Sequence, residues 1–393
     1  MKLIILDPGL TELSGHHFNY NSYIFKECKV RGIGLTIFSH AACDESVADV
    51  LPIRRCFHIN TYDCQTVATQ EDMKYKFSVF NNMMETNLLE TVDIQFDPDD
   101  VIVMITATVF QIVGVLNWYS TLPVKRPRIC IQFMHQPWYL GLESDPDYCT
   151  SLLRHAMGAW ADQSDLRITF AADQDVLGNF LHEVSGFPIR ILPMPIDYPP
   201  LPIGESPIGE SKAGTGRLRI GFLGDGRPEK GLHHLVKAII DQKDDPLPNV
   251  DFFIHISNQQ GRIAYDLLKD VPNCTVVCKQ FTGAEYWETA RSCDVIVLPY
   301  DPKYYHIRGS GILFEAMGLG KPIVVTSGSC LDWLAAKYNG AAVRCGFASE
   351  SLLEAIRIIA GNFADFEEIA QISAVQVRAI HNPKSFFDAL LRE

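Results

Sequence analysis

The sequence predicts two α/β domains, each built on a parallel β-sheet with helices on both faces. Short apolar runs rich in Val and Ile alternate along the chain with longer segments of helical periodicity, which is the pattern of repeated strand–helix units. A segment rich in Pro, Gly and Ser, residues 196–217, divides the chain near its midpoint and can sustain neither helix nor central strand. At 393 residues the chain is also too long for one ordinary core.

These observations set the expected domain boundaries. We predict a first domain over residues 1–196, a linker over 197–217 and a second domain over 218–393. The amphipathic segment KSFFDALL, residues 384–391, has an apolar face that could dock on the first domain. The start, MKLIILD, has an apolar run of four residues before Asp7, so we expect a first strand there and no signal peptide.

The composition argues against several classes of partner. A net charge of −13 and a pI of about 5.4 make nucleic acid an unsuitable one. No stretch approaches the roughly 18 apolar residues of a membrane span, so we expect no transmembrane segment, while peripheral contact with a membrane stays open. The eleven cysteines include no Cys-x-x-Cys pair. We therefore expect reduced thiols, no metal site and a cytoplasmic protein.

Strands and helices alternate in the first domain. The expected strands span residues 2–7, 34–40, 53–59, 100–106, 128–135, 167–172 and 189–195. Helical periodicity marks residues 18–30, 73–89, 148–160 and 173–184. Because strands joined through helices are parallel, we expect ligands at their carboxyl ends, in the loops that follow them.

Two loops of the first domain carry polar side chains at that edge. After the first strand, Gly15 loosens the backbone, and His16, His17 and Asn19 crowd the start of the first helix. These groups either contact a phosphate or an acceptor hydroxyl, or serve as caps and surface residues. His135 ends the fifth strand, where an open sheet exposes its ligand edge, and is a candidate site residue for that reason.

A glycine-rich junction is the main feature of the second domain. Its expected strands span residues 218–224, 251–257, 274–279, 293–300, 322–326 and 341–345, with helices beyond 349. Between the strand at 293–300 and the helical segment ILFEAMG, Gly309, Ser310 and Gly311 allow a sharp turn, with Ser310 available as a helix cap. Such a junction directs backbone N–H groups and the positive end of the helix dipole at an anion.

Two further features of the second domain point to a nucleotide. Glu315 lies on the first or second turn of that helix, and its carboxylate can accept hydrogen bonds from both hydroxyls of a ribose. After the strand at 218–224, glycines frame Arg227 and Lys230 ahead of an amphipathic helix. The planar guanidinium of an arginine beside the flexible ammonium group of a lysine suits a diphosphate. The alternative is an ordinary Gly-rich turn beside solvated charges.

Three motifs together resemble one family. SGILFEAMGLGKPIVVTSG is similar to the family's pattern of Gly, apolar residues, Glu-Ala-Met and Gly-Lys-Pro before a strand. LGDGRPEKGLHHLVKAI is similar to its phosphate-binding region, and LPMPID to the segment that ends its first domain. The family is that of the retaining glycosyltransferases of the GT-B fold, family four, or glycosyl transferases group 1. The resemblance covers most of residues 218–345, and the first half in layout alone.

The resemblance implies a fold and an activity. The GT-B fold has two Rossmann-like domains that face each other across a cleft. The implied activity is metal-independent transfer of a sugar, with retention, from a UDP- or GDP-linked donor to an acceptor hydroxyl on a saccharide, a lipid-linked molecule or a protein. No cofactor would be needed, and the enzyme would act in polysaccharide or glycoconjugate biosynthesis.

The resemblance also implies roles for the candidate residues. Glu315 would bind the ribose, and Arg227 and Lys230 would bind the diphosphate. His135 would lie near the transferred sugar. The phosphate and the sugar would be held by the backbone amides of Gly309, Ser310, Gly311 and Ile312.

Three positions depart from the family pattern, and one of them is Ser310, which aligns with the usual glycine of the phosphate loop. Ile307 stands where the family usually has a second glutamate that contacts the donor sugar, and Asp225 stands where its arginine commonly lies. Two rival interpretations stay open. One is a GT-B nucleotide-sugar epimerase or a sugar phosphorylase, and the other is a scaffold that has kept the fold and lost the chemistry, which Ile307 favours.

Overall fold

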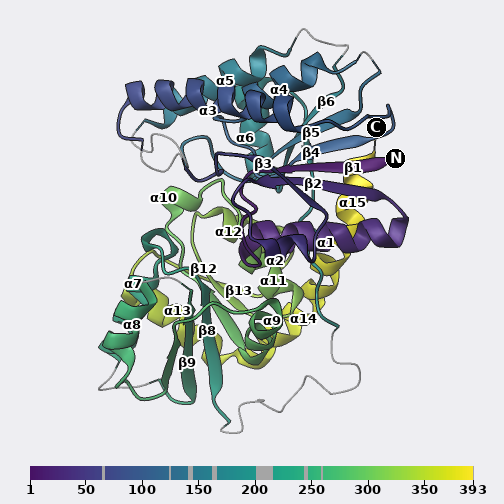
Figure 1. The fold of residues 1–393 in the computed structure, drawn as a ribbon. Coiled ribbons are helices and arrows are strands. Elements are labelled where there is room, and N and C mark those ends of the chain that lie inside the picture. Colours follow the sequence, from purple (N-terminus) through teal and green to yellow (C-terminus); the bar gives the residue numbers. More distant parts are fainter. Residues whose placement is uncertain are drawn as a thin grey trace. The chain divides into compact units, whose positions relative to one another are not determined.

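The chain forms two units in the computed structural model, each built around one β-sheet (Figure 1). The structure describes residues 1–63, 67–123, 125–139, 145–161, 166–200, 216–242, 247–257 and 260–392. The first unit holds Met1–Ile196 and Pro383–Glu393, and the second holds Asp197–Asn382. Most of the expected linker, residues 201–215, lies outside the described residues.

The first unit is built on a seven-stranded parallel sheet in the order β3-β2-β1-β4-β5-β6-β7. Its strands are β1 Lys2–Asp7, β2 Gly34–His40, β3 Ile53–Phe57, β4 Val101–Met104, β5 Arg128–Phe133, β6 Ile168–Ala172 and β7 Ile189–Ile191. Apolar side chains dominate the central strands because helices cover both faces of such a sheet. The chain order reverses between β1 and β4, and an open parallel sheet binds its ligands at such a reversal.

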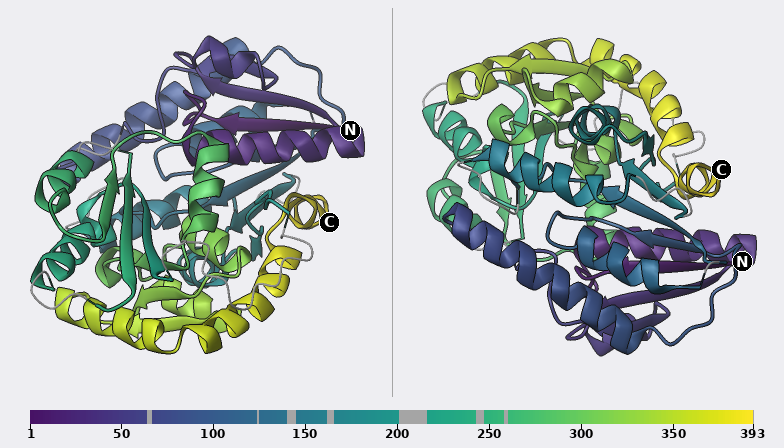
Figure 2. Two further views of the ribbon diagram at one scale, coloured as in Figure 1. Left: turned by 90° about the horizontal axis from the view of Figure 1, so that it is seen from below. Right: turned by 90° about the horizontal axis from the view of Figure 1, so that it is seen from above.

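Helices from both ends of the chain cover this sheet (Figure 2). They are α1 Gly15–Arg31, α2 Glu45–Ala48, α3 Gln70–Thr91, α4 Ile112–Thr121, α5 Pro146–Gly158, α6 Asp175–Ser185 and α15 Pro383–Leu391. Phe386, Phe387 and Leu390 of α15 are buried in the core of this unit. Arg31 of α1 donates to the carboxylate of Asp388 at 2.8 Å, which fixes α15 beside α1.

The second unit is built on a six-stranded parallel sheet in the order β10-β9-β8-β11-β12-β13. Its strands are β8 Leu218–Gly224, β9 Val250–Ile256, β10 Cys274–Val277, β11 Val295–Leu298, β12 Ile323–Thr326 and β13 Ala342–Cys345. Here the chain order reverses between β8 and β11. The two glycine-containing loops that the sequence singled out follow these two strands, so the fold brings them to one point of the sheet edge.

Helices again flank the second sheet (Figures 1 and 2). They are the short 3-10 helix η1 Pro228–Lys230, α7 Leu232–Asp241, α8 Gln260–Leu268, α9 Gly283–Ser292, α10 Pro302–Tyr305, α11 Gly311–Gly318, α12 Cys330–Lys337, α13 Ser349–Gly361 and α14 Phe363–Ile380. Apolar residues of α7, α8 and α13 pack with strands β8, β9 and β11 in one buried cluster.

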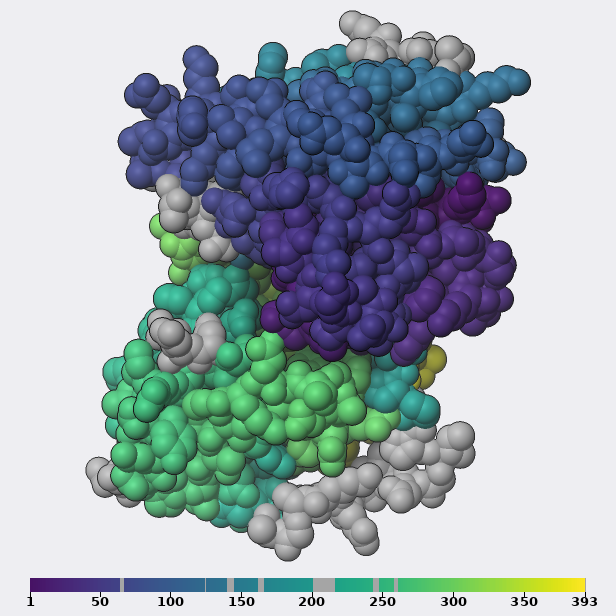
Figure 3. Space-filling view, in the orientation of Figure 1, coloured from purple at the N-terminus to yellow at the C-terminus, as the bar shows by residue number. Residues whose placement is uncertain are grey.

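The predicted α/β class with two parallel sheets is confirmed. The strands lie where they were expected, although several are shorter. The strand expected at residues 189–195 is limited to β7, because Pro193 and Pro195 lack the backbone donor that a sheet needs. None of the described helices has the length and apolar character that crossing a membrane requires. Figure 3 shows the surface of each unit, coloured along the chain.

Candidate active site

The loop after β8 packs closely on the end of β11. Gly231 closes η1 with a positive φ of 70°, and a Cβ at this position would lie 2.0 Å from the backbone oxygen of Pro299. The backbone N–H of Asp301 donates to the oxygen of Glu229 at 2.8 Å. A glycine is therefore required here both for its backbone conformation and for the close approach of the two loops.

Lys230 is carried to the point where these loops meet. Its side chain is buried, with 8% of the residue exposed, and its Nζ lies 5.6 Å from the centre of the Tyr300 ring. Desolvation and the neighbouring charge of Arg227 lower the pKa of Lys230 to about 8, against the opposing effect of Asp225. Burial of the ammonium group thus outweighs the compensation that Asp225 supplies, and a bound anion would offset the same cost.

Arg227 has carboxylates on both sides. Its guanidinium lies 3.3 Å from Glu229 and 3.8 Å from Asp225. Desolvation would raise the pKa of Asp225, but Lys230, the Ser257 hydroxyl at 2.8 Å and Arg227 together hold it below its usual value. Asp225, the position that departs from the family pattern, is therefore an ionised partner of the two cations.

The start of α11 lies against the same point. A Cβ added to Gly224 would lie 3.0 Å from Cδ1 of Ile312 and 3.4 Å from Nζ of Lys230. Ser310 occupies the N-cap position, but its side chain makes no capping hydrogen bond, which corrects the expectation of a serine cap. The hydroxyl instead lies beside Tyr300. Burial and Tyr305 raise the pKa of Tyr300, and Ser310 opposes this rise.

Glu315 lies one turn into α11 and is held by a residue that the sequence did not single out. The hydroxyl of Tyr286, on α9, donates a short hydrogen bond to the Glu315 carboxylate. Burial raises the pKa of Glu315, while Tyr286 and the charge of Lys230 oppose the rise. The tyrosine hydroxyl thus takes one of the acceptor positions that a ribose hydroxyl would use.

A hydrogen-bonded chain follows β1 in the first unit. Asp7 is fully buried and accepts from the Gly9 backbone at 3.0 Å, His17 Nδ1 at 2.7 Å and Asn21 Nδ2 at 2.6 Å. His17 Nε2 lies 3.0 Å from the Tyr62 hydroxyl, which lies 3.0 Å from His16 Nε2. An aspartate that accepts from Nδ1 fixes the tautomer of His17, so that Nε2 accepts from the tyrosine.

The other predicted residues of this loop have different surroundings. Gly15 begins α1 with a positive φ of 74°, and Asn19 is half-buried on the helix. Of the four residues expected on the acceptor or phosphate side, His16 and His17 are therefore linked through Tyr62, and Gly15 has a backbone role.

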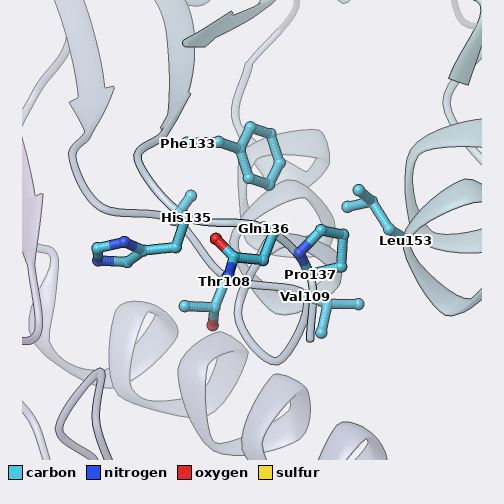
Figure 4. A pocket seen from close by; sticks show the side chains of 8 residues that line it. Thr108, Val109, Phe133, His135, Gln136, Pro137 and Leu153 are labelled. Atoms are coloured by element: carbon cyan, nitrogen blue, oxygen red, sulfur yellow. The ribbon is translucent and has the colours of Figure 1, made fainter. Parts of the chain in front are cut away.

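His135 follows β5 beside a small cavity of about 10 Å³. Its ring lies 4.5 Å from that of Tyr139 and points away from the apolar wall that Pro137 and Leu153 form (Figure 4). Thr108 and Gln136 supply polar atoms beside it (Figure 4). His135 is thus at the carboxyl edge of the first sheet, where the sequence placed it.

The family comparison agrees with the geometry of the second unit. Residues 217–362, which include Arg227, Lys230 and Glu315, match the family model described as glycosyl transferases group 1. The second unit is a group 1 glycosyltransferase domain. A sequence comparison with curated proteins finds no match.

Solved structures show that the glycosyltransferase has the GT-B fold. Sucrose-phosphate synthase from Thermosynechococcus elongatus is similar with a TM-score of 0.65 at 14% identity, over 99% of this chain and 97% of that one. Anabaena HepE in complex with UDP-glucose has a TM-score of 0.63 at 14% identity, over 99% and 98%. WaaG, a glycosyltransferase involved in lipopolysaccharide biosynthesis, has a TM-score of 0.59 at 13% identity, over 99% and 98%.

The fold brings together the predicted residues of the glycosyltransferase domain. Lys230, Arg227, Ile312 and Glu315 surround the junction between β8, β11 and α11. The sequence pattern missed the tyrosines that contact them, Tyr286 and Tyr300, because an aromatic residue in a helix or at a strand end is usually a packing residue. The sequence did offer one signal for Asp7 as a site residue, because its carboxylate ends an apolar strand.

Proposed function

We propose that this glycosyltransferase moves a sugar from a nucleoside diphosphate to an acceptor hydroxyl, with retention of anomeric configuration and without a metal or cofactor. The observation that carries the proposal is the arrangement around α11. A buried lysine and a carboxylate flank the amino end of this helix at the chain reversal of the second sheet. Phosphate and ribose need these two kinds of group side by side.

The proposed chemistry depends on stabilising the leaving group. The bond between the anomeric carbon and the β-phosphate oxygen breaks, and its electron pair stays with the phosphate. The acceptor oxygen bonds to the same carbon, and its proton passes to the departing phosphate. Lys230, Arg227 and the amino end of α11, with the backbone of residues 309–312, offset the charge that develops on the phosphate.

In this proposal the first unit binds the acceptor. His135 would lie near the transferred sugar, and the Asp7–His17–Tyr62–His16 chain supplies polar groups for acceptor hydroxyls. The acceptor is a saccharide, a lipid-linked molecule or a protein. We place the reaction in the cytoplasm and in polysaccharide or glycoconjugate biosynthesis.

The donor is a UDP- or GDP-linked sugar in this proposal. The similar structure of Anabaena HepE holds UDP-glucose, which supports UDP as the first nucleotide to test. The experiment incubates the purified protein with UDP-, GDP- and dTDP-sugars and acceptor mixtures, and it measures thermal shift, donor hydrolysis and the anomeric configuration of any product. A retained configuration with added EDTA supports the full proposal, and an inverted product contradicts retention.

The same experiment separates the alternative functions. Ile307 is 8% exposed where the family has a glutamate that contacts the donor sugar, and this favours a catalytically inactive scaffold. Stabilisation by nucleotide sugars without hydrolysis or transfer would support the scaffold. Conversion of the free donor to its epimer would support an epimerase. Absence of any response to the three nucleotides would contradict nucleotide binding.

A further inference from the structure

A second buried cation lies beside Lys230. Arg308 is 6% exposed, and its guanidinium carbon lies 4.8 Å from the centre of the Tyr305 ring. The Tyr305 ring lies 4.6 Å from that of Tyr300, the ring beside Lys230. The two cations therefore reach one aromatic pair from different loops, Lys230 from the loop after β8 and Arg308 from the loop after β11.

Arg308 also acts electrostatically on the lysine. Its charge contributes to the lowered pKa of Lys230 and opposes the raised pKa of Tyr300. Two like charges that are buried together repel each other. An anion placed between them is attracted to both, and this attraction offsets the repulsion. Arg308 also directly precedes the segment Gly309–Ser310 that leads into α11.

Arg227 is in a different situation. Its guanidinium, with 31% of the side chain exposed, lies 3.3 Å from Glu229 and 3.8 Å from Asp225, two carboxylates that also act on Lys230 from a greater distance. A half-buried cation that is paired with carboxylates contributes less to anion binding than a fully buried one. Lys230 and Arg308 thus provide two buried positive charges, which match the two negative charges of the diphosphate in a sugar donor.

We propose that Arg308 is a diphosphate-binding residue of this glycosyltransferase and that, with Lys230, it contributes more to holding the diphosphate than Arg227 does. The inference rests on the proposed function for its ligand. A planar guanidinium can donate two parallel hydrogen bonds to phosphate oxygens, which an ammonium group cannot. Because Lys230 supplies a second buried cation, the site should bind a diphosphate, which has a phosphate group for each cation, more tightly than a monophosphate.

The test compares Arg308→Gln, Arg308→Lys and Arg227→Gln by calorimetric titration with UDP, UMP, uridine and inorganic pyrophosphate. Arg308→Gln should weaken UDP and pyrophosphate binding about ten- to hundredfold and leave uridine binding unchanged, because one charge-assisted phosphate contact is lost. Arg308→Lys should recover part of the loss. Arg227→Gln should weaken UDP binding by at most about threefold.

Two results would overturn the inference. One is a UDP and pyrophosphate affinity of Arg308→Gln within about threefold of the wild-type affinity. The other is an equal loss for uridine, which would show a structural role. Pyrophosphate separates this inference from the proposed function. The wild-type protein could bind pyrophosphate through Arg308 and yet bind none of the UDP-, GDP- and dTDP-sugars. In that case the proposed function fails and the anion site is still supported.

Discussion

Lys230 shows how one buried side chain can set the pH range of a binding site. Its pKa of about 8 means that the Lys230 side chain is mostly charged at neutral pH in the free protein and loses its charge in mildly alkaline solution. A bound diphosphate stabilises the ammonium form and raises its pKa. Binding is therefore strongest below the pKa of the free lysine.

The first prediction concerns this lysine. UDP affinity should fall as the pH rises through about 8, because the neutral amine cannot offset phosphate charge. Lys230→Gln should flatten this dependence and lower turnover about a hundredfold or more, as expected for lost transition-state stabilisation. Dissociation constants and initial rates across the pH range measure both effects. An identical alkaline fall in the variant would assign the titration to another group.

The second prediction concerns Glu315 and its tyrosine partner. Glu315→Gln should weaken nucleoside binding about tenfold, because a charged acceptor of ribose hydroxyls is lost. Tyr286→Phe should strengthen it several-fold, because the carboxylate then has no tyrosine hydroxyl bound in the free protein. Uridine titration of both variants makes the comparison, with CD spectra as a control for folding. Weaker binding by Tyr286→Phe would instead make the tyrosine a direct contact for the nucleoside.

At the scale of elements, the glycine loops position the site. Gly231 has a positive φ and approaches the Pro299 oxygen closely, whereas Gly328 has a similar positive φ of 75° and open space around it. The two glycines form a matched pair, because one combines backbone strain with a steric clash and the other has the strain alone.

The third prediction uses this pair. Gly328→Ala should cost about 1 kcal/mol of unfolding free energy, the usual cost of a left-handed alanine. Gly231→Ala should cost at least about 1 kcal/mol more and should also abolish UDP binding, because the loop that carries Lys230 must move away from β11. Denaturant unfolding and UDP titration measure both. Normal UDP binding by Gly231→Ala would show that Lys230 does not depend on this loop packing.

The sequence predicted the elements well and their contacts poorly. Strands and loops follow from local patterns of apolar and glycine residues, so the loops that bear Lys230 and Glu315 could be identified. The pairing of His17 with Tyr62 and of Glu315 with Tyr286 joins residues far apart in the chain. Local patterns carry no information on such contacts. The capping role expected of Ser310 was wrong for the same reason, since the serine hydroxyl lies beside Tyr300.

At the scale of the whole molecule, the chain divides into two units, and the first unit is made of two segments that lie far apart in the sequence. The helix α15 belongs to the first unit, although the entire second unit precedes it in the chain. Its two phenylalanines are fully buried there, and the Phe386 ring lies 5.5 Å from that of Tyr20 in an edge-to-face contact.

The fourth prediction tests this division. Phe386→Ala should destabilise the first unit by about 3–5 kcal/mol through lost burial and a cavity. Val30→Ala, an exposed position on α1, should cost less than about 0.5 kcal/mol. UDP should raise the unfolding temperature of the second unit in both variants, since ligand binding stabilises the unit that holds the ligand. A single unfolding transition that Phe386→Ala lowers and UDP raises as a whole would show that the two units unfold as one.

The place of α15 also sets an order for biosynthesis. A ribosome makes β1 to β7 first, yet the apolar surface they share with α15 must wait until nearly two hundred further residues, 197–382, have been translated. During that interval the newly made sheet exposes the surface that Phe386 and Phe387 will cover. Premature termination anywhere within the glycosyltransferase domain would therefore leave the segment made earliest without its covering helix, open to chaperones and proteases.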